Sequence, residues 1–203
     1  MLRLYDSRLS GNAWKVRILL TQLGLPFERV TLDLAKGAAS EPAFRAKSRF
    51  ARVPVLELED GRTIVESAAI MLYLAEGTSF LPDDRFLRAE VTSWLTFEQA
   101  DLLRAIALPR IYSIRGMADQ MAARIADFQE AAYPALAKVD AWLSNHTWLV
   151  DERYTIADIG LFCYVSMADQ GGYEMQRFPA IHAWLARVKA QPGWVPLTEE
   201  ARA

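Results

Sequence analysis

The sequence of 203 residues contains a single cysteine, Cys163. One cysteine excludes an intrachain disulfide, a Cys-x-x-Cys redox pair and a zinc ribbon. No apolar run approaches the roughly 18 residues that a membrane span requires, and the chain does not open with a basic region followed by an apolar one. The sequence therefore predicts a cytoplasmic protein with no signal peptide and no membrane partner.

An excess of charge of one sign is also lacking. Lys and Arg number 23, Asp and Glu number 25, and the formal net charge is −2. Without a basic stripe, a nucleic-acid partner is not expected. The hydrophobic content of 52% and the charged content of 24% are typical of a soluble globular protein. The length allows one large domain or two small ones.

Residues 51–69 carry the pattern of a β-hairpin that leads directly into a helix. Residues 55–59 alternate apolar and acidic side chains, which is the period of a half-buried strand. Asp60-Gly61 predicts the two-residue turn, because these residue types tolerate positive φ angles. Ser67 stands at the N-cap position, before an apolar helical run.

Two features of this stretch indicate a binding site for a short peptide. Val53-Pro54 would leave the backbone of Val53 free for an extended ligand if the bond is cis. Glu66 and Ser67 stand at a helix start, where backbone N–H groups and the helix dipole attract anions. The alternative is an ordinary hairpin with an ordinary capped helix.

The order of elements in residues 1–77 predicts a thioredoxin-like domain, βαβαββα. A short apolar strand opens the chain, a helix begins at Ala13 and is closed by Gly24 as its C′ residue, and residues 27–34 alternate as a second strand. A short helix around 41–46 precedes the hairpin and the helix already described. Such an order forms a mixed four-stranded sheet covered by helices.

After a probable linker at 78–84, strand patterns disappear. The sequence predicts an all-helical bundle over 85–203, which would hold the second substrate. Thr155-Ile-Ala-Asp158 is similar to a capping box before the apolar helix 159–167. The other expected helices cover 85–112, 117–143 with a kink at Pro134, and a last helix that begins at Phe178-Pro179 and ends at 191–193.

Four stretches make the whole chain resemble the cytosolic glutathione transferases, in particular their serine-type zeta and theta-like branches. They are Val53-Pro54-Val55-Leu56 with Ile64-Val65-Glu66-Ser67-Ala68-Ala69-Ile70, then Thr155-Ile-Ala-Asp158, then Phe178-Pro179 through Trp184 to Gln191-Pro192, and Ser10-Gly-Asn-Ala-Trp-Lys-Val-Arg-Ile-Leu-Leu20. The run 48–51 departs from the family's usual Asn-Pro-x-Gly, and Asn12 replaces the cysteine of the zeta motif, so zeta-type isomerase activity is not supported.

The resemblance implies how glutathione, as co-substrate, would be held. Val53 would pair its backbone with the cysteinyl unit, with Pro54 cis. Glu66 and Ser67 would hold the γ-glutamyl amine and carboxylate. Arg52 stands where the family places a residue that meets the glycyl carboxylate. No metal is implied.

Ser10 aligns with the serine that donates a hydrogen bond to the glutathione sulfur. Independently, a donor beside a helix N-terminus lowers a thiol pKa from its usual ~8.5. Ser10 would then stabilise the thiolate and would not be the nucleophile, which would require a nearby base such as histidine. Both histidines lie in the helical half. Asn12 and Tyr5 are rival donors to the sulfur.

The expected function is attack of the glutathione thiolate on a small hydrophobic electrophile. The alternatives are a non-catalytic binding protein of this family, and a glutathione-dependent peroxidase or disulfide reductase. The resemblance also implies a homodimer, in which Gln99 or Asp101 of one subunit contacts the γ-glutamyl group bound to the other. Possible wall residues of the second-substrate pocket, which could equally be core, are Trp94, Phe97, Glu98, Gln99, Tyr112 and Arg115.

Overall fold

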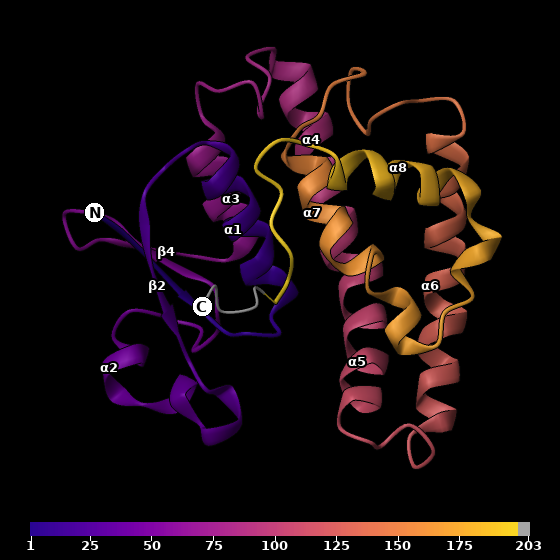
Figure 1. Cartoon of the computed structure of the whole chain (residues 1–203), viewed down its shortest axis with the longest axis horizontal. Helices are drawn as coiled ribbons and strands as arrows, with labels where there is room; N and C mark the ends of the chain where they lie inside the picture. The colour runs from indigo at the N-terminus through magenta and orange to yellow at the C-terminus, as the bar shows by residue number, and fades with distance from the viewer. Residues whose placement is uncertain (199–203) are drawn as a thin grey trace. The chain divides into compact units, whose positions relative to one another are not determined.

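The computed structural model describes residues 1–198 (Figure 1). The chain divides into two compact units. The first consists of residues 1–78 together with the C-terminal stretch from Pro192, and the second is Ser79–Gln191. The sequence-based domain 85–203 placed the C-terminal stretch with the helices, and its last residues, 199–203, lie outside the described part. The limits at 77 and 85 stay predictions.

The first unit contains a four-stranded mixed sheet in the order β2-β1-β3-β4. β1 (Leu2–Asp6) pairs in parallel with β2 (Phe27–Thr31) and antiparallel with β3 (Val55–Glu57), which pairs antiparallel with β4 (Thr63–Val65). Strand β2 ends three residues before the predicted limit at 34, because Asp33 instead caps a 3₁₀ turn with its side chain. The expected thioredoxin-like βαβαββα arrangement is confirmed.

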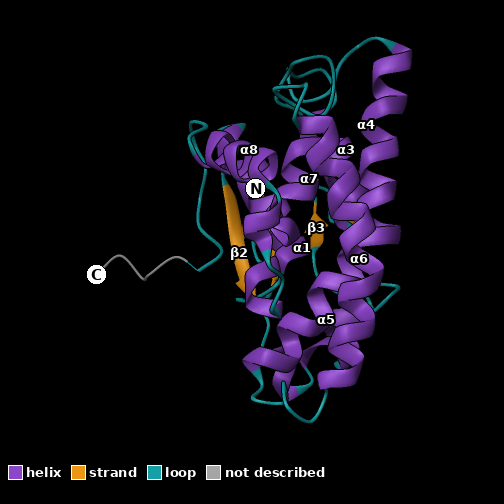
Figure 2. Ribbon diagram, turned by 90° about the vertical axis from the view of Figure 1, so that its right-hand side faces the viewer, coloured by secondary structure: helices purple, strands orange, loops and turns teal. Residues whose placement is uncertain are grey.

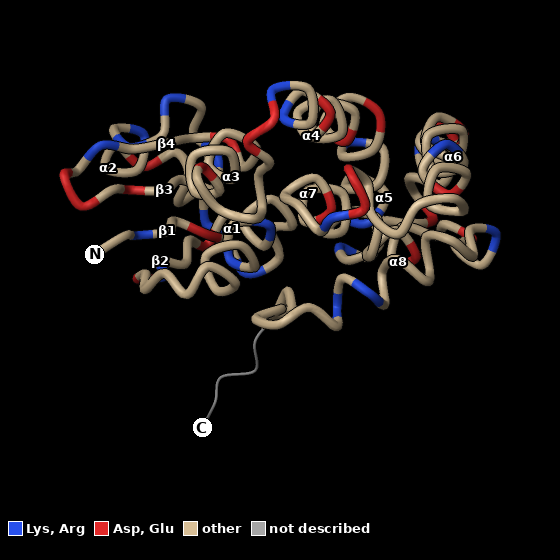
Figure 3. Tube along the Cα trace, turned by 90° about the horizontal axis from the view of Figure 1, so that it is seen from above, with Lys and Arg blue, Asp and Glu red and all other residues tan. Residues whose placement is uncertain are grey.

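Helices cover both faces of this sheet. α1 (Gly11–Gln22) and α3 (Ser67–Ala75) lie on one side of the strands, and α2 (Pro42–Arg45) lies on the other (Figure 3). The register explains this division, because Tyr5, Val55 and Val65 pair across the strands and pack with Phe44 of α2. The alternate residues, Leu4 and Leu56 among them, are fully buried on the face that α1 and α3 cover.

The second unit is entirely helical over its described residues, apart from one isolated β-bridge (Figure 2). The long stretch predicted as one helix over 85–112 is two α-helices joined by a π-helical turn, Glu98–Leu102. Pro109 and Pro134 lie inside helices. The helices are α4 (Arg85–Phe97), α5 (Leu103–Ile114), α6 (Ala122–Leu143), α7 (Ile156–Val165) and α8 (Pro179–Lys189).

The capping box predicted at the start of α7 is present. The Thr155 hydroxyl accepts a hydrogen bond from the Ala157 N–H, and the Asp158 carboxylate accepts one from the Thr155 N–H at 3.0 Å. Asp158 also accepts hydrogen bonds from the Trp184 indole of α8 and from the Leu149 N–H. Burial raises the pKa of Asp158 to about 6, although these hydrogen bonds act in the opposite direction.

None of the helices within residues 1–198 is both long enough and apolar enough to cross a membrane.

Candidate functional site

One edge of the sheet in the first unit gathers most of the residues that the sequence singled out. β1 ends there at Asp6, β4 ends there at Val65, and β3 begins there. In the register of β3 and β4, Val55 pairs with Val65, so Val53 comes to the level of Ser67 two residues further along. The N-terminus of α1, which follows β1, and that of α3, which follows β4, start at this same edge.

The Val53-Pro54 peptide bond is cis, as the resemblance implied. Within residues 1–198, the backbone N–H and C=O of Val53 have no hydrogen-bond partner. The preceding residue is firmly held, because the buried Ser48 hydroxyl accepts from the Arg52 N–H at 3.1 Å and donates to the Arg52 carbonyl at 3.0 Å. The Arg52 side chain itself is exposed. This arrangement leaves Val53 able to pair with an extended ligand.

Glu66 has an unusual backbone conformation at the junction of β4 and α3. Its φ is +73° and its ψ is 123°, a combination that a residue with a side chain rarely adopts. The Glu66 side chain is exposed, whereas Ser67, the first residue of α3, is 2% exposed. The first backbone N–H groups of a helix have no partner inside the helix, so this junction offers donors to an anion and a carboxylate to a cation.

Ser10 is the N-cap of α1. Its hydroxyl oxygen accepts a hydrogen bond from the Ala13 N–H at 3.2 Å, and its backbone is extended. An N-cap hydroxyl that accepts through its oxygen still has its own O–H to donate. The serine can therefore cap the helix and donate to a ligand at the same time, so the two functions do not compete.

Asn12 connects the starts of α1 and α3. Its side-chain oxygen accepts a hydrogen bond from the Ser67 hydroxyl at 3.3 Å and another from the Lys15 ammonium at 2.9 Å. Lys15 is only 1% exposed. The sequence pattern alone does not distinguish Lys15, because a lysine between apolar positions of a helix normally faces solvent.

Tyr5 lies on the other face of the sheet from α1. Its hydroxyl donates to the Glu57 carboxylate at 2.6 Å, and its ring packs against Phe44 of α2. The Lys47 ammonium lies 2.8 Å from the same carboxylate and holds the pKa of Glu57 below its usual range. Tyr5 is thus engaged away from the start of α1, and the structure does not favour it as a donor to a ligand there.

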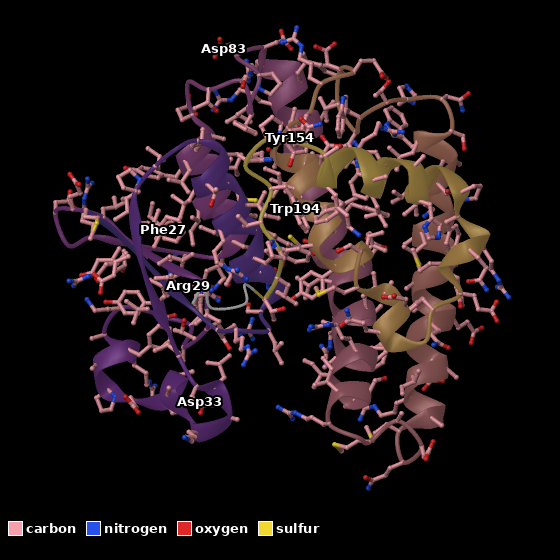
Figure 4. All side chains as sticks on the ribbon, viewed as in Figure 1. Phe27, Arg29, Asp33, Asp83, Tyr154 and Trp194 are labelled. Carbon is pink, nitrogen blue, oxygen red and sulfur yellow. The ribbon has the colours of Figure 1, made fainter. Side chains whose placement is uncertain are left out.

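The C-terminal segment, Pro192–Thr198, packs along α1 of the first unit. The Trp14 indole donates to the Val195 carbonyl at 2.7 Å, and the Arg17 guanidinium donates to the Pro196 and Leu197 carbonyls. Figure 4 labels Trp194, whose ring meets that of Trp14 edge-on at 6.3 Å. This packing explains why the segment belongs to the first unit.

The remaining candidates belong to the second unit. Gln99 lies in the π-helical turn, and its amide donates to the buried Glu98 carboxylate at 2.7 Å. π-Helical turns often occur at functional sites. Trp94 and Phe97 meet edge-on at 5.8 Å and are partly buried, while Asp101 and Arg115 are exposed. The roles of these residues in binding stay predictions.

Cys163 is fully buried in α7, as expected. Within residues 1–198, no group of three or more His, Cys, Asp or Glu side chains is placed to share a metal ion.

Comparison with known families gives matches over both units. The family described as "Glutathione S-transferase, N-terminal domain" matches residues 4–79, and "Glutathione S-transferase, C-terminal domain" matches residues 103–192. The crystal structure of a glutathione S-transferase from Pseudomonas fluorescens has 38% sequence identity and a TM-score of 0.95. That match covers 98% of this chain and 99% of the other.

More distant relatives have different names. Protein URE2 of Candida maltosa is 26% identical over 93% of this chain and 70% of its own length. The disulfide-bond oxidoreductase YfcG of Escherichia coli is 28% identical over 89% of this chain and 87% of its own length. Sequence identity of this degree therefore extends to proteins that are not named as glutathione transferases.

Proposed function

Because the chain belongs to the glutathione S-transferase family, we propose that it binds glutathione at the sheet edge of its first unit and activates the thiol for attack on a small hydrophobic electrophile. The observation that carries the proposal is the hydrogen bond between Asn12 and Ser67. It brings the residues expected at the sulfur next to those expected at the γ-glutamyl group. A pocket that binds both the cysteinyl sulfur and the γ-glutamyl group of glutathione would need both sets of residues close together.

In the proposed complex, each part of glutathione meets a group of matching chemistry. The unpaired backbone of Val53 bonds the cysteinyl unit as an added strand would. The Glu66 carboxylate takes the γ-glutamyl amine, and the start of α3 at Ser67 takes the γ-glutamyl carboxylate. The exposed Arg52 guanidinium is available for the glycyl carboxylate.

The proposed chemical step is nucleophilic substitution by sulfur. The Ser10 hydroxyl and the N-terminus of α1 favour the thiolate, and the thiol proton leaves to solvent. The sulfur forms a bond to an electrophilic carbon, and the leaving group, such as a halide, departs with its electron pair. Asn12 is a second donor, because among the described residues Lys15 and Ser67 bond its oxygen and leave its NH₂ group available.

The name of the relative YfcG supports a second candidate, reduction of disulfides with glutathione as the thiol source. This chain's own Cys163 does not serve such a reaction, because it is fully buried. A glutathione-dependent peroxidase uses the same activated thiolate. A non-catalytic role would keep the glutathione site but lack turnover.

We further propose a serine-type cytoplasmic homodimer without a metal cofactor. Gln99 or Asp101 of one subunit would contact the γ-glutamyl group bound to the other. The half-buried aromatic side chains of the second unit, Trp94 and Phe97 among them, would contribute to the pocket for the electrophile.

The test combines calorimetric titration of glutathione with rates on an aromatic chloride, an organic hydroperoxide and a mixed disulfide. We expect Ser10→Ala to lower the maximal rate by roughly 100-fold, as the loss of a donor to a developing anion does, while the Kd for glutathione changes by less than about threefold. Ser67→Ala is the matched control, since it removes a hydroxyl expected to hold glutathione and should mainly weaken binding.

No binding at millimolar glutathione would reject the proposal. Equal loss of binding and rate in Ser10→Ala would show that this serine only caps the helix. Turnover confined to the disulfide would establish the second candidate instead.

A further inference from the structure

Lys15 is a buried cation that the proposed binding mode does not use. Its side chain is 1% exposed, and its ammonium donates to the Asn12 side-chain oxygen at 2.9 Å. Burial of a charged group is costly unless partners compensate for the lost water. A lysine at this place in α1 therefore needs polar partners, and the Asn12 side-chain oxygen is one of them.

The contact determines how the Asn12 amide is oriented. An ammonium group can only donate, so the Asn12 atom that faces it must be the oxygen. The Ser67 hydroxyl approaches the same oxygen from α3, at 3.3 Å. With both lone pairs of the oxygen directed to donors, the NH₂ group lies on the other branch of the amide. Within residues 1–198, the Asn12 NH₂ group has no acceptor.

We propose that Lys15 is a positioning residue for the sulfur of glutathione: it holds the Asn12 oxygen and so directs the Asn12 NH₂ group toward the thiolate at the start of α1. The inference rests on the proposed function and deepens it. Without Lys15, the amide is free to turn its oxygen to the sulfur, and an oxygen there repels the thiolate. The positive charge also polarises the amide and strengthens its N–H donors.

Lys15 is better suited to this role than Ser67. The Ser67 hydroxyl is expected to turn to the γ-glutamyl carboxylate when glutathione binds, and its hydrogen bond to Asn12 is the longer of the two. The ammonium has three donors and can keep its bond to Asn12 whatever Ser67 does. The orientation of the amide is thereby maintained in the complex.

The test measures the thiol pKa of bound glutathione from the ultraviolet absorbance of the thiolate as the pH is varied. In Lys15→Met, which keeps the length of the side chain and removes its charge, we expect this pKa to rise by about one unit, or tenfold less thiolate at low pH. The Kd for S-methylglutathione, which has no thiol, should change by less than about threefold, because the groups that grip the peptide are untouched.

The second arm is a double-mutant cycle with Asn12→Ala. If Lys15 acts through Asn12, Lys15→Met should add little to the pKa rise that Asn12→Ala already causes. Lys15→Gln, which keeps an N–H donor to the Asn12 oxygen, should recover part of the lost thiolate. If Lys15→Met fails to fold, Lys15→Gln provides the test in its place.

Three outcomes would overturn the inference: an unchanged thiol pKa in both Lys15 variants, the same shift with and without Asn12, or loss of S-methylglutathione binding in parallel with the pKa rise. The second outcome would indicate a general effect of charge, and the third a structural role. Failure of the proposed function is separate, because it shows in the wild-type chain as absence of glutathione binding.

Discussion

Individual residues around the sheet edge have backbone conformations that the chain would not adopt for stability alone. Glu66 has φ +73°, and Ala51, two residues before Val53, has φ +52°. Conformations of this kind cost of order 1–3 kcal/mol and persist where the surrounding structure imposes them, frequently at binding sites. At Glu66, the conformation lets strand β4 turn directly into α3 and leaves the carboxylate exposed.

Substitution of Glu66 by glycine separates backbone strain from binding. In Glu66→Gly, relief of strain should offset the roughly 0.5–1 kcal/mol that glycine's extra freedom costs, so the free energy of unfolding in urea should stay equal or rise. Loss of the carboxylate should weaken glutathione binding at least about tenfold by calorimetry. Ala51→Gly is the matched control and should leave binding unchanged. Wild-type affinity in Glu66→Gly would remove this residue from the site.

At the scale of elements, α1 joins distant parts of the first unit. Its start carries Ser10, and its middle carries Arg17, which is 2% exposed and lies 3.0 Å from the fully buried Asp6 of β1. Arg29 of β2, labelled in Figure 4, lies 2.6 Å from the same carboxylate. Arg17 also holds the C-terminal segment, so one guanidinium ties together three parts of the chain.

Removal of this guanidinium should be strongly destabilising. In Arg17→Met, Asp6 loses a buried partner and two carbonyls lose their donor, so we expect the free energy of unfolding to fall by about 3–5 kcal/mol in urea. Arg3→Met is the control, because its ion pair with Glu28 is exposed to solvent and should contribute little to stability. The double variant Asp6→Asn/Arg17→Met should lose less than the sum of the single changes. Strict additivity would argue against the coupling.

The start of α7 should make stability depend on pH. The pKa of Asp158 is raised to about 6 by burial, above its ordinary value near 3.8. The native state therefore binds this proton more tightly than the unfolded chain. The resulting stabilisation is complete below about pH 4 and is lost as the pH rises through 6.

The Asp158→Asn variant isolates this effect. The difference in unfolding free energy between wild type and Asp158→Asn should fall as the pH rises from 4 to 7, since asparagine does not titrate. Urea titrations at several pH values measure the difference. If it rises with pH instead, the three N–H donors around the carboxylate outweigh the cost of its burial.

At the scale of the whole molecule, the chain combines an α/β unit and a helical unit, and each unit is compact. Within one subunit, the proposed glutathione contacts come from the first unit. Gln99 and Asp101, in the π-helical turn between α4 and α5, are the residues through which a second subunit would act on bound glutathione.

We expect sedimentation velocity at micromolar concentration to show a species of twice the chain's mass. Gln99→Ala or Asp101→Ala should then weaken glutathione binding by roughly threefold to tenfold without changing the oligomeric state, because each would remove one polar contact. Asp119→Ala, an acidic-to-alanine change in the second unit outside the π-helical turn, is the control. A monomer that binds glutathione normally would contradict the contribution of a second subunit.

The fold was largely predictable because its helices and strands carry residue patterns that can be recognised from neighbouring positions alone. The strand before Asp60-Gly61 and the capping box at Thr155 and Asp158 each involve neighbours in sequence. The N-cap predicted at Ser67 was wrong by one residue, because Glu66 holds that position without a side-chain cap and Ser67 is the first residue of α3. The π-helical turn at Glu98–Leu102 was missed, because the residues there keep an ordinary helical periodicity. The docking of the C-terminal segment was missed because it relies on contacts with residues some 180 positions earlier.

By itself, the sequence determined most of the order of the elements, since this follows from residue type and short-range spacing. Its resemblance to a known family implied which residues would meet glutathione. Only the tertiary structure decided which of those residues come together. It placed Asn12 of α1 against Ser67 of α3, buried Lys15 behind them, and turned Tyr5 to the opposite face. Contacts between distant segments depend on strand register and helix packing, and no local pattern encodes them.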